Sequence, residues 1–142
     1  MAFGDVRAFP VPADLTASTP LASGGPLGEV HAGLGRLAVR LAPAAPHRIV
    51  ARVRGEIDMD VAQDLREALV TALRASSTGL DLDLGAVTFC DCAGLNVLID
   101  LRASAADADK SLVLTALSGP VGRLLRITGT DGDFTVAGGP EA

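Results

Sequence analysis

Residues 87–106, VTFCDCAGLNVLIDLRASAA, constrain the fold more than any other stretch of this chain. The segment opens apolar, breaks at residues 91–94, and continues with apolar residues spaced three and four positions apart. This pattern predicts a strand, a tight turn and a helix. Asp91 has the short acceptor side chain that caps helix N-termini, so Cys92 is expected in the first helical turn, exposed at the end of the strand.

The predicted helix start admits two interpretations. The N-terminus of a helix has unpaired N–H groups and the positive end of the helix dipole, so it tolerates an anion or a phosphate. A strand, turn and helix with an aspartate cap also occurs for purely structural reasons in most α/β proteins. The local pattern alone does not separate these alternatives.

Regular patterns before this stretch predict a hairpin and a helix. Segments 36–41 and 48–54 alternate polar and apolar residues, which is typical of half-buried strands. Their short connection favours antiparallel pairing. A helix is predicted over 61–75 because its apolar residues form one stripe, and Asp60 followed by Gln63 fits a capping arrangement.

The remaining patterns complete an α/β fold. A strand is predicted at 80–84, a buried strand at 111–117, a helix from Pro120 to Gly129, and an edge strand at 134–136. The order of these elements implies a small mixed β-sheet of four to five strands with three or four helices packed against it.

Asp81 and Asp83 lie on the same face of the predicted strand at 80–84. Paired carboxylates can serve acid/base chemistry or hold a metal. No His, Lys or third acid converges on them in the sequence, which favours a solvated strand face or local capping contacts. Cys90 and Cys92 are separated by a single residue, and no mutual disulfide is predicted between them. We expect no metal and no cofactor, since a zinc site needs about four ligands.

Composition narrows the function classes. The chain has 142 residues, a net charge of −5, no Trp or Tyr, and no basic cluster. This argues against nucleic-acid partners and against an anionic membrane surface. The cysteine usage and the lack of an apolar stretch of about 20 residues predict a cytoplasmic protein without membrane insertion. We expect a flexible extension over 1–33, one domain over 34–137, and a flexible tail over 138–142.

Three segments together resemble the STAS domain of bacterial anti-sigma factor antagonists. Residues 52–58, RVRGEID, resemble that family's second strand with its Gly-Glu-Leu/Ile-Asp step. Residues 87–95, VTFCDCAGL, resemble its Phe-x-Asp-Ser-x-Gly-Leu loop, and residues 124–131 ahead of Phe134 resemble its closing helix and turn. The resemblance covers residues 34–136.

The resemblance implies a non-enzymatic partner-switching protein in transcription regulation. In that family, the unphosphorylated domain binds an anti-sigma factor, often a serine-protein kinase of the histidine-kinase-like ATPase type, and so frees the sigma factor. The kinase then phosphorylates the hydroxyl after the loop aspartate. The resemblance assigns the partner-binding surface to six residues: Asp58, Asp91, Cys92, Ala93, Gly94 and Asn96.

The sequence departs from the family at the phosphoacceptor position. Cys92 follows Asp91 and Ala93 comes next, so neither position offers a hydroxyl. A serine kinase cannot use a thiol in its place, and Thr88 precedes the loop within the strand. We therefore expect an antagonist that is constitutively competent, or that is controlled by its abundance or by other inputs.

Three alternatives remain open on the sequence. Cys92 at a helix N-terminus can act as a thiol redox switch, although Asp91 beside it opposes thiolate formation. The domain can instead belong to another complex, such as a lipid-transport ATPase or a stress-signalling assembly. An enzyme would need a base near Cys92, and His31 and His47 lie in segments far upstream.

Gly94 carries a separate expectation. Small residues at the start of the helix allow a partner backbone to approach closely. A large residue at Gly94 is therefore expected to abolish docking and to leave the fold largely intact.

Overall fold

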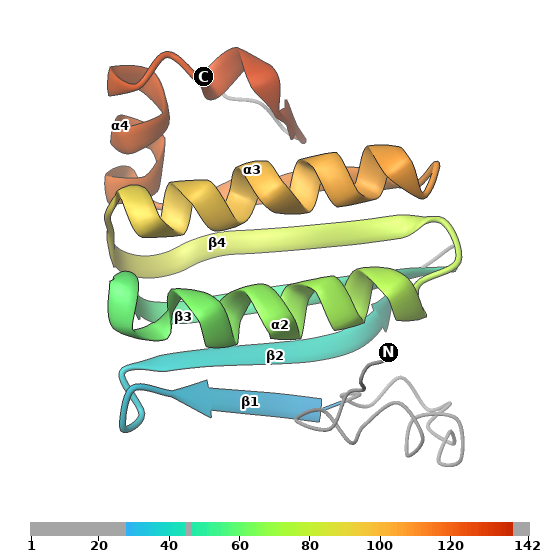
Figure 1. Ribbon diagram of the computed structural model, residues 1–142, viewed down its shortest axis with the longest axis horizontal. Helices are drawn as coiled ribbons and strands as arrows, with labels where there is room; N and C mark the ends of the chain where they lie inside the picture. The colour runs from blue at the N-terminus through green and yellow to red at the C-terminus, as the bar shows by residue number, and fades with distance from the viewer. Residues whose placement is uncertain (1–27, 45–46, 138–142) are drawn as a thin grey trace.

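A six-stranded mixed sheet forms the centre of the computed structural model, which describes residues 28–44 and 47–137. The strands lie in the sheet in chain order (Figure 1). They are β1 (Gly28–Ala32), β2 (Leu37–Ala44), β3 (Arg48–Ile57), β4 (Gly79–Cys90), β5 (Ser111–Leu117) and β6 (Thr135–Val136). The pairs β1–β2 and β2–β3 are antiparallel, and the remaining pairs are parallel.

Helices connect the parallel strands. They are α2 (Met59–Ala75), α3 (Cys92–Asp107) and α4 (Gly119–Ile127), followed by the short 3-10 helix η2 (Asp131–Asp133). Helices α2 and α3 lie side by side over one face of the sheet (Figure 1). The predicted class, a mixed sheet with helices packed against it, is confirmed. Within the described ranges the sheet has six strands rather than four or five.

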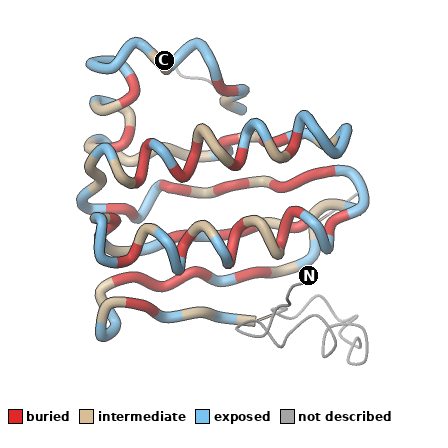
Figure 2. The backbone as a smooth tube through the Cα atoms, in the orientation of Figure 1, coloured by how far each residue is buried: buried red, intermediate tan, exposed pale blue. Residues whose placement is uncertain are grey.

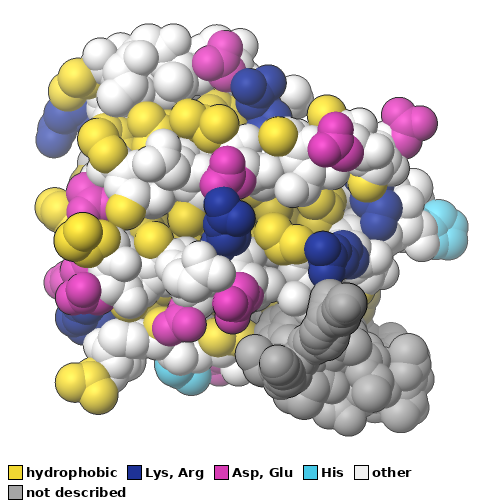
Figure 3. Space-filling view, in the orientation of Figure 1, with side chains coloured by type: hydrophobic (Ala, Val, Ile, Leu, Met, Phe, Trp, Pro, Cys, Tyr) yellow, Lys and Arg dark blue, Asp and Glu magenta, His cyan; other side chains and the backbone are white. Residues whose placement is uncertain are grey.

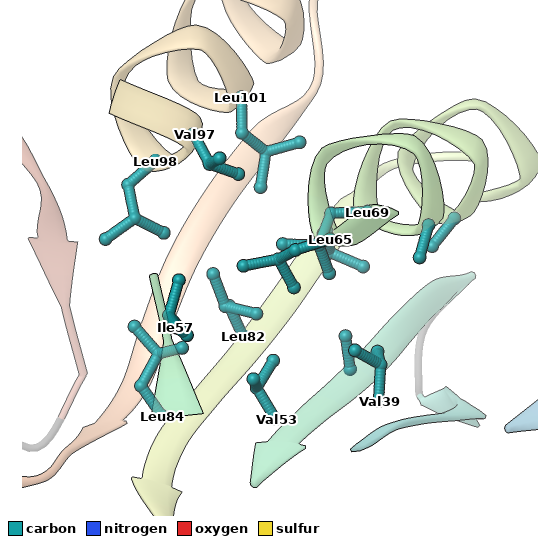
Figure 4. Close-up of a cluster of buried hydrophobic side chains, with 14 of the residues drawn as sticks. Val39, Val53, Ile57, Leu65, Leu69, Leu82, Leu84, Val97, Leu98 and Leu101 are labelled. Carbon is teal, nitrogen blue, oxygen red and sulfur yellow. The ribbon is translucent and has the colours of Figure 1, made fainter. Parts of the chain in front are cut away.

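The core lies between the sheet and these two helices. Alternate strand residues, such as Val53 and Leu82, point toward α2 and α3 and meet Leu65, Leu69 and Leu101 (Figure 4). Buried positions alternate with exposed ones along both helices (Figure 2). The core is therefore mainly aliphatic, with Phe134 as its buried aromatic residue among the residues described, and its burial is the main favourable term that holds the helices on the sheet.

The opposite face of the sheet carries charged residues. Asp81 accepts a hydrogen bond from Arg48 at 2.8 Å, and Asp83 lies 3.6 Å from Arg52. Both aspartates thus lie on the face away from the helices, each beside an arginine of the neighbouring strand β3. An acid/base or metal role for this pair finds no support, because each carboxylate has a cation as its partner.

Helix α2 begins earlier than predicted. It starts at Met59, and its N-cap is Asp58, whose side chain accepts a hydrogen bond from the Asp60 backbone N–H at 3.0 Å. The predicted cap at Asp60 is wrong. The Gln63 side chain donates instead to Glu67, one turn further along the helix.

The strands also differ in extent from the prediction. Strand β4 is continuous from Gly79 to Cys90 and so joins the two segments that the sequence predicts separately. Strand β1 lies before the predicted domain boundary at residue 34. The predicted flexible segments outside β1, residues 1–27 and 138–142, lie beyond the described residues.

One end of the sheet gathers four chain junctions. The β1–β2 turn and the junctions β3–α2, β4–α3 and β5–α4 all lie at the left-hand end in Figure 1. Parallel strands place their carboxyl ends at one edge of the sheet, which is where α/β folds commonly bind ligands. Across the described ranges, no helix combines the length and apolar character needed to cross a bilayer.

Candidate functional site

Asp91 caps helix α3 as the sequence predicts. Its Oδ1 accepts hydrogen bonds from the backbone N–H groups of Ala93 at 2.9 Å and Gly94 at 3.4 Å. Cys92 is consequently the first residue of the helix, and it is exposed. The predicted cap and the predicted place of Cys92 are both confirmed.

The start of α3 is attached to the end of strand β3. The Asp91 backbone N–H donates to the Ile57 carbonyl oxygen at 3.2 Å. Asp58 follows Ile57 directly and caps α2. The two capping aspartates, 33 positions apart in sequence, therefore lie at the ends of neighbouring strands.

Gly94 lies in the interior. A Cβ atom on Gly94 would lie 2.6 Å from the Cys90 Sγ atom and 2.7 Å from the Ile57 Cγ2 atom, both shorter than real contacts allow. Glycine is needed here because the helix approaches β3 and β4 closely. The expectation that a large residue at Gly94 would spare the fold is therefore wrong on steric grounds.

The six predicted surface residues differ in exposure. Cys92 and Asn96 are exposed, whereas Asp58, Asp91 and Ala93 are half-buried. Gly94 is buried, so the structure separates it from the residues that a partner can touch.

Two apolar residues that the sequence analysis did not select lie beside these positions. Met59, the residue after the Asp58 cap, is 75% exposed, and Phe89, two residues before Asp91, is 49% exposed. Met59 lies outside the apolar stripe of α2, so the sequence pattern is sufficient to predict its exposure. The exposure of Phe89 does not follow from the sequence, because Val87 is buried and strand alternation predicts the same face for Phe89.

Charged groups surround this end of the sheet. Arg36, in the β1–β2 turn, donates from Nη1 to Asp58 Oδ2 at 2.7 Å and to Glu56 Oε1 at 3.3 Å. The hydrogen bond from Arg36 holds the pKa of the Asp58 carboxyl below its usual range, so this side chain stays ionised. Asp58 thus joins the cap of α2 to the β1–β2 turn.

The two thiols have different environments. Burial, together with the nearby Asp91 carboxylate, raises the pKa of Cys90 to about 11. Cys90 is therefore a protonated, partly buried thiol, whereas Cys92 faces solvent.

Neither metal binding nor thiol catalysis finds support here. Among residues 28–44 and 47–137, no three His, Cys, Asp or Glu side chains converge as metal ligands would. His47 lies in the β2–β3 turn at the other end of the sheet, and His31 lies in β1, three strand spacings or about 14 Å from β4. Neither histidine is placed to act as a base for Cys92.

Solved structures similar to this fold include anti-sigma factor antagonists. One, from Mycobacterium paratuberculosis, has a TM-score of 0.64 and 24% identity, covering 78% of this chain and 92% of that one. SpoIIAA in its unphosphorylated form has a TM-score of 0.58 and 19% identity, covering 70% of this chain and 87% of that one. At these identities, the similarity defines the fold class.

Sequence comparison then identifies the family. The family model described as "Mlab, STAS domain" matches residues 40–137. An anti-sigma-B factor antagonist of Staphylococcus epidermidis is 30% identical over 78 residues, which cover 55% of this chain and 72% of that protein. The chain belongs to the STAS domain family, and anti-sigma factor antagonists are among its distant relatives.

Gly94→Ala tests the packing at the start of α3. The added methyl group overpacks the contact with Cys90 and Ile57, so urea denaturation should show a loss of about 1–3 kcal/mol in the free energy of unfolding. The double variant Cys90→Ala/Gly94→Ala should recover part of this loss because the sulfur atom is gone.

Gly122→Ala in α4 is the matched control. The nearest atom to its Cβ would be Arg126 Nη1 at 3.5 Å, an ordinary contact, so this variant should be unchanged or more stable by up to about 1 kcal/mol. An equally stable Gly94→Ala protein would contradict the close packing of α3 on β3.

Proposed function

We propose that this STAS protein is a non-enzymatic antagonist that regulates transcription by binding an anti-sigma factor of the serine-kinase type. The contact is made by a helix-start surface at one end of the sheet. It consists of Asp58, Met59, Phe89, Asp91, Cys92, Ala93 and Asn96. The observation that carries the proposal is the exposed Cys92 at the first position of α3, close in sequence to the exposed ring of Phe89.

The surface has the composition of a protein interface. Met59 and Phe89 place apolar area in water, and removing a side chain of this size from water contributes about 1.5–3 kcal/mol. Aromatic residues and methionine are enriched at interfaces. Arg36 pairs with Asp58 and also with Glu56 and Asp60, so one positive charge faces three carboxylates at this end of the sheet. The carboxylate of Asp91 adds to this negative excess, so a partner with basic side chains at its rim fits this surface.

Cys92 fixes the mode of control in this proposal. It stands where the antagonists that this chain resembles have the hydroxyl acceptor. A cysteine side chain is small and weakly polar, so it preserves the surface that binds the partner. Thr88, the nearest hydroxyl residue along the sequence, donates from Oγ1 to the Gly55 carbonyl oxygen at 3.3 Å. The chain thus stays competent to bind, and its abundance or its partner sets the response.

A second candidate is a STAS module in another complex, such as a lipid-transport ATPase or a stress-signalling assembly. The observation that favours it is the matching family model, which is described as Mlab and not as an antagonist. The same surface would serve a different partner. Affinity capture with the intact chain and with Cys92→Glu as the negative control separates the two, since each predicts a different partner that depends on this surface.

Introducing a charge at Cys92 tests the surface. Cys92→Glu should weaken binding to the serine-kinase anti-sigma factor of the same organism at least tenfold by isothermal titration calorimetry, or about 1.4 kcal/mol, because a buried carboxylate without a partner is costly. Ser77→Glu adds the same charge to an exposed site at the other end of the sheet and should bind normally. Equal affinities for the two variants would place the contact elsewhere.

Restoring the hydroxyl tests the mode of control. After incubation with the kinase and ATP, the unaltered chain should carry no phosphate by mass spectrometry, and Cys92→Ser should carry one. The added charge of about −1.5 to −2 would have to be desolvated against the partner, so it should release the partner. Phosphate on Thr88 or Ser104 of the unaltered chain would refute the proposed control.

Alkylation rates test the thiol-switch candidate, which the exposure of Cys92 at a helix start favours. Cys90 is an internal control: with its pKa near 11, it should react about 300-fold more slowly than free cysteine, whose pKa is about 8.5, because its thiolate fraction is lower by that factor. Cys92 should react no faster than free cysteine. A Cys92 rate well above that of free cysteine would support redox control, and a fast Cys90 would contradict its burial.

A further inference from the structure

The β1–β2 turn holds a leucine in an unfavourable conformation. Leu34 has φ +59° and lies between Gly33 at +62° and Gly35 at +90°. Hairpin positions with positive φ favour glycine, asparagine and aspartate, because other side chains clash with the backbone there. The Leu34 side chain is also fully exposed, with a relative accessibility of 105%. The fold therefore gains nothing from leucine at this position.

The turn is fixed to the start of α2. The Glu56 backbone N–H donates to the Arg36 carbonyl oxygen at 3.1 Å, and the Arg36 side chain binds Asp58. A Cβ on Gly33 would lie 2.6 Å from Val61 Cγ1, so the turn also packs closely against the first turn of α2. The turn that carries Leu34 is thus bound to Asp58, which directly precedes Met59.

Exposed apolar side chains concentrate at this end of the sheet. Within the described ranges, four large hydrophobic residues are exposed: Leu34, Met59, Phe89 and Ile127. The first three belong to the β1–β2 turn and to the junctions that carry the helix-start surface, and Ile127 ends α4. Figure 3 shows hydrophobic side chains protruding at the left-hand end of the molecule, with acidic groups between them.

We propose that Leu34 is an anchor residue of the same docking surface and extends it from α3 across to the β1–β2 turn. The inference rests on the proposed function, and its occupant is the anti-sigma factor. Arg36 pairs with Glu56, Asp58 and Asp60, so the turn keeps an excess of negative charge, and the Glu56 and Asp60 side chains are 49% and 78% exposed. That partner must therefore offer an apolar pocket for Leu34 with basic side chains at its edge.

If Leu34 is an anchor in an unfavourable backbone conformation, replacing it should raise the stability of the free protein and lower its affinity for the partner. Leu34→Asn relieves the backbone conformation and removes exposed apolar area, so it should raise the urea midpoint of the free protein. It also removes the anchor, so calorimetry should show binding to the anti-sigma factor weakened at least tenfold. A residue that acts only in the turn would change stability and leave the affinity unchanged.

His47→Asn is the matched control. His47 has φ +65° in the β2–β3 turn at the other end of the sheet, so the same substitution there should leave the affinity unchanged. Weaker binding by Leu34→Asn alone supports the proposal. If Leu34→Asn binds the anti-sigma factor normally and Cys92→Glu binds it more weakly, the role of Leu34 as an anchor is overturned and the proposed function still stands.

Two further outcomes are informative. No binding by the unaltered chain overturns both the proposed function and the anchor. The other outcome is that the unaltered chain self-associates in sedimentation equilibrium, and that Leu34→Asn abolishes this self-association without changing the affinity for the anti-sigma factor. That result would overturn the anti-sigma factor as the occupant and would identify a second copy of the chain instead.

Discussion

Ile57 holds together the end of the sheet on which the candidate site depends. Its carbonyl oxygen accepts the Asp91 N–H, and its side chain, 1% exposed, occupies the space where Gly94 would otherwise carry a Cβ. Asp58 follows it and caps α2. One residue thus fixes the start of α3 against the end of β3 and sets the separation of the two capping aspartates. The exposed residues around it are held by this buried contact.

The sequence predicted the features that depend on local chemistry. Asp91 caps α3, and Pro120 lies in the first turn of α4, because these side chains satisfy or remove N–H groups within a few residues. The strand at 80–84 followed from the alternation of leucine with aspartate. In each case the cause and the consequence lie within one turn or one strand, where a sequence pattern is informative.

The features that the sequence missed depend on distant contacts. Asp58, and not Asp60, caps α2, and Asp58 is held by Arg36, which lies 22 residues earlier. Gly94 is buried because β3 and β4 pass beneath it, although its place in a glycine-containing turn suggested an open surface. Phe89 is exposed because β4 shifts register against β3 between Gly55 and Glu56, a change that no alternation pattern records. Only the resemblance to the antagonists predicts from sequence that Asp58 and Asp91 belong to one surface.

The cap on α3 also explains why this surface should respond to charge. Asp91 Oδ1 already engages the N–H groups of Ala93 and Gly94 and places a carboxylate at the helix start. A second anion on residue 92 would find those donors occupied and a like charge beside it, so its charge would remain at the surface and would have to be desolvated against any partner. A thiol at residue 92 leaves the cap unchanged and offers no hydroxyl. In the proposed mode of control, the position therefore stays sensitive to charge, and phosphorylation of that residue is no longer the way to add it.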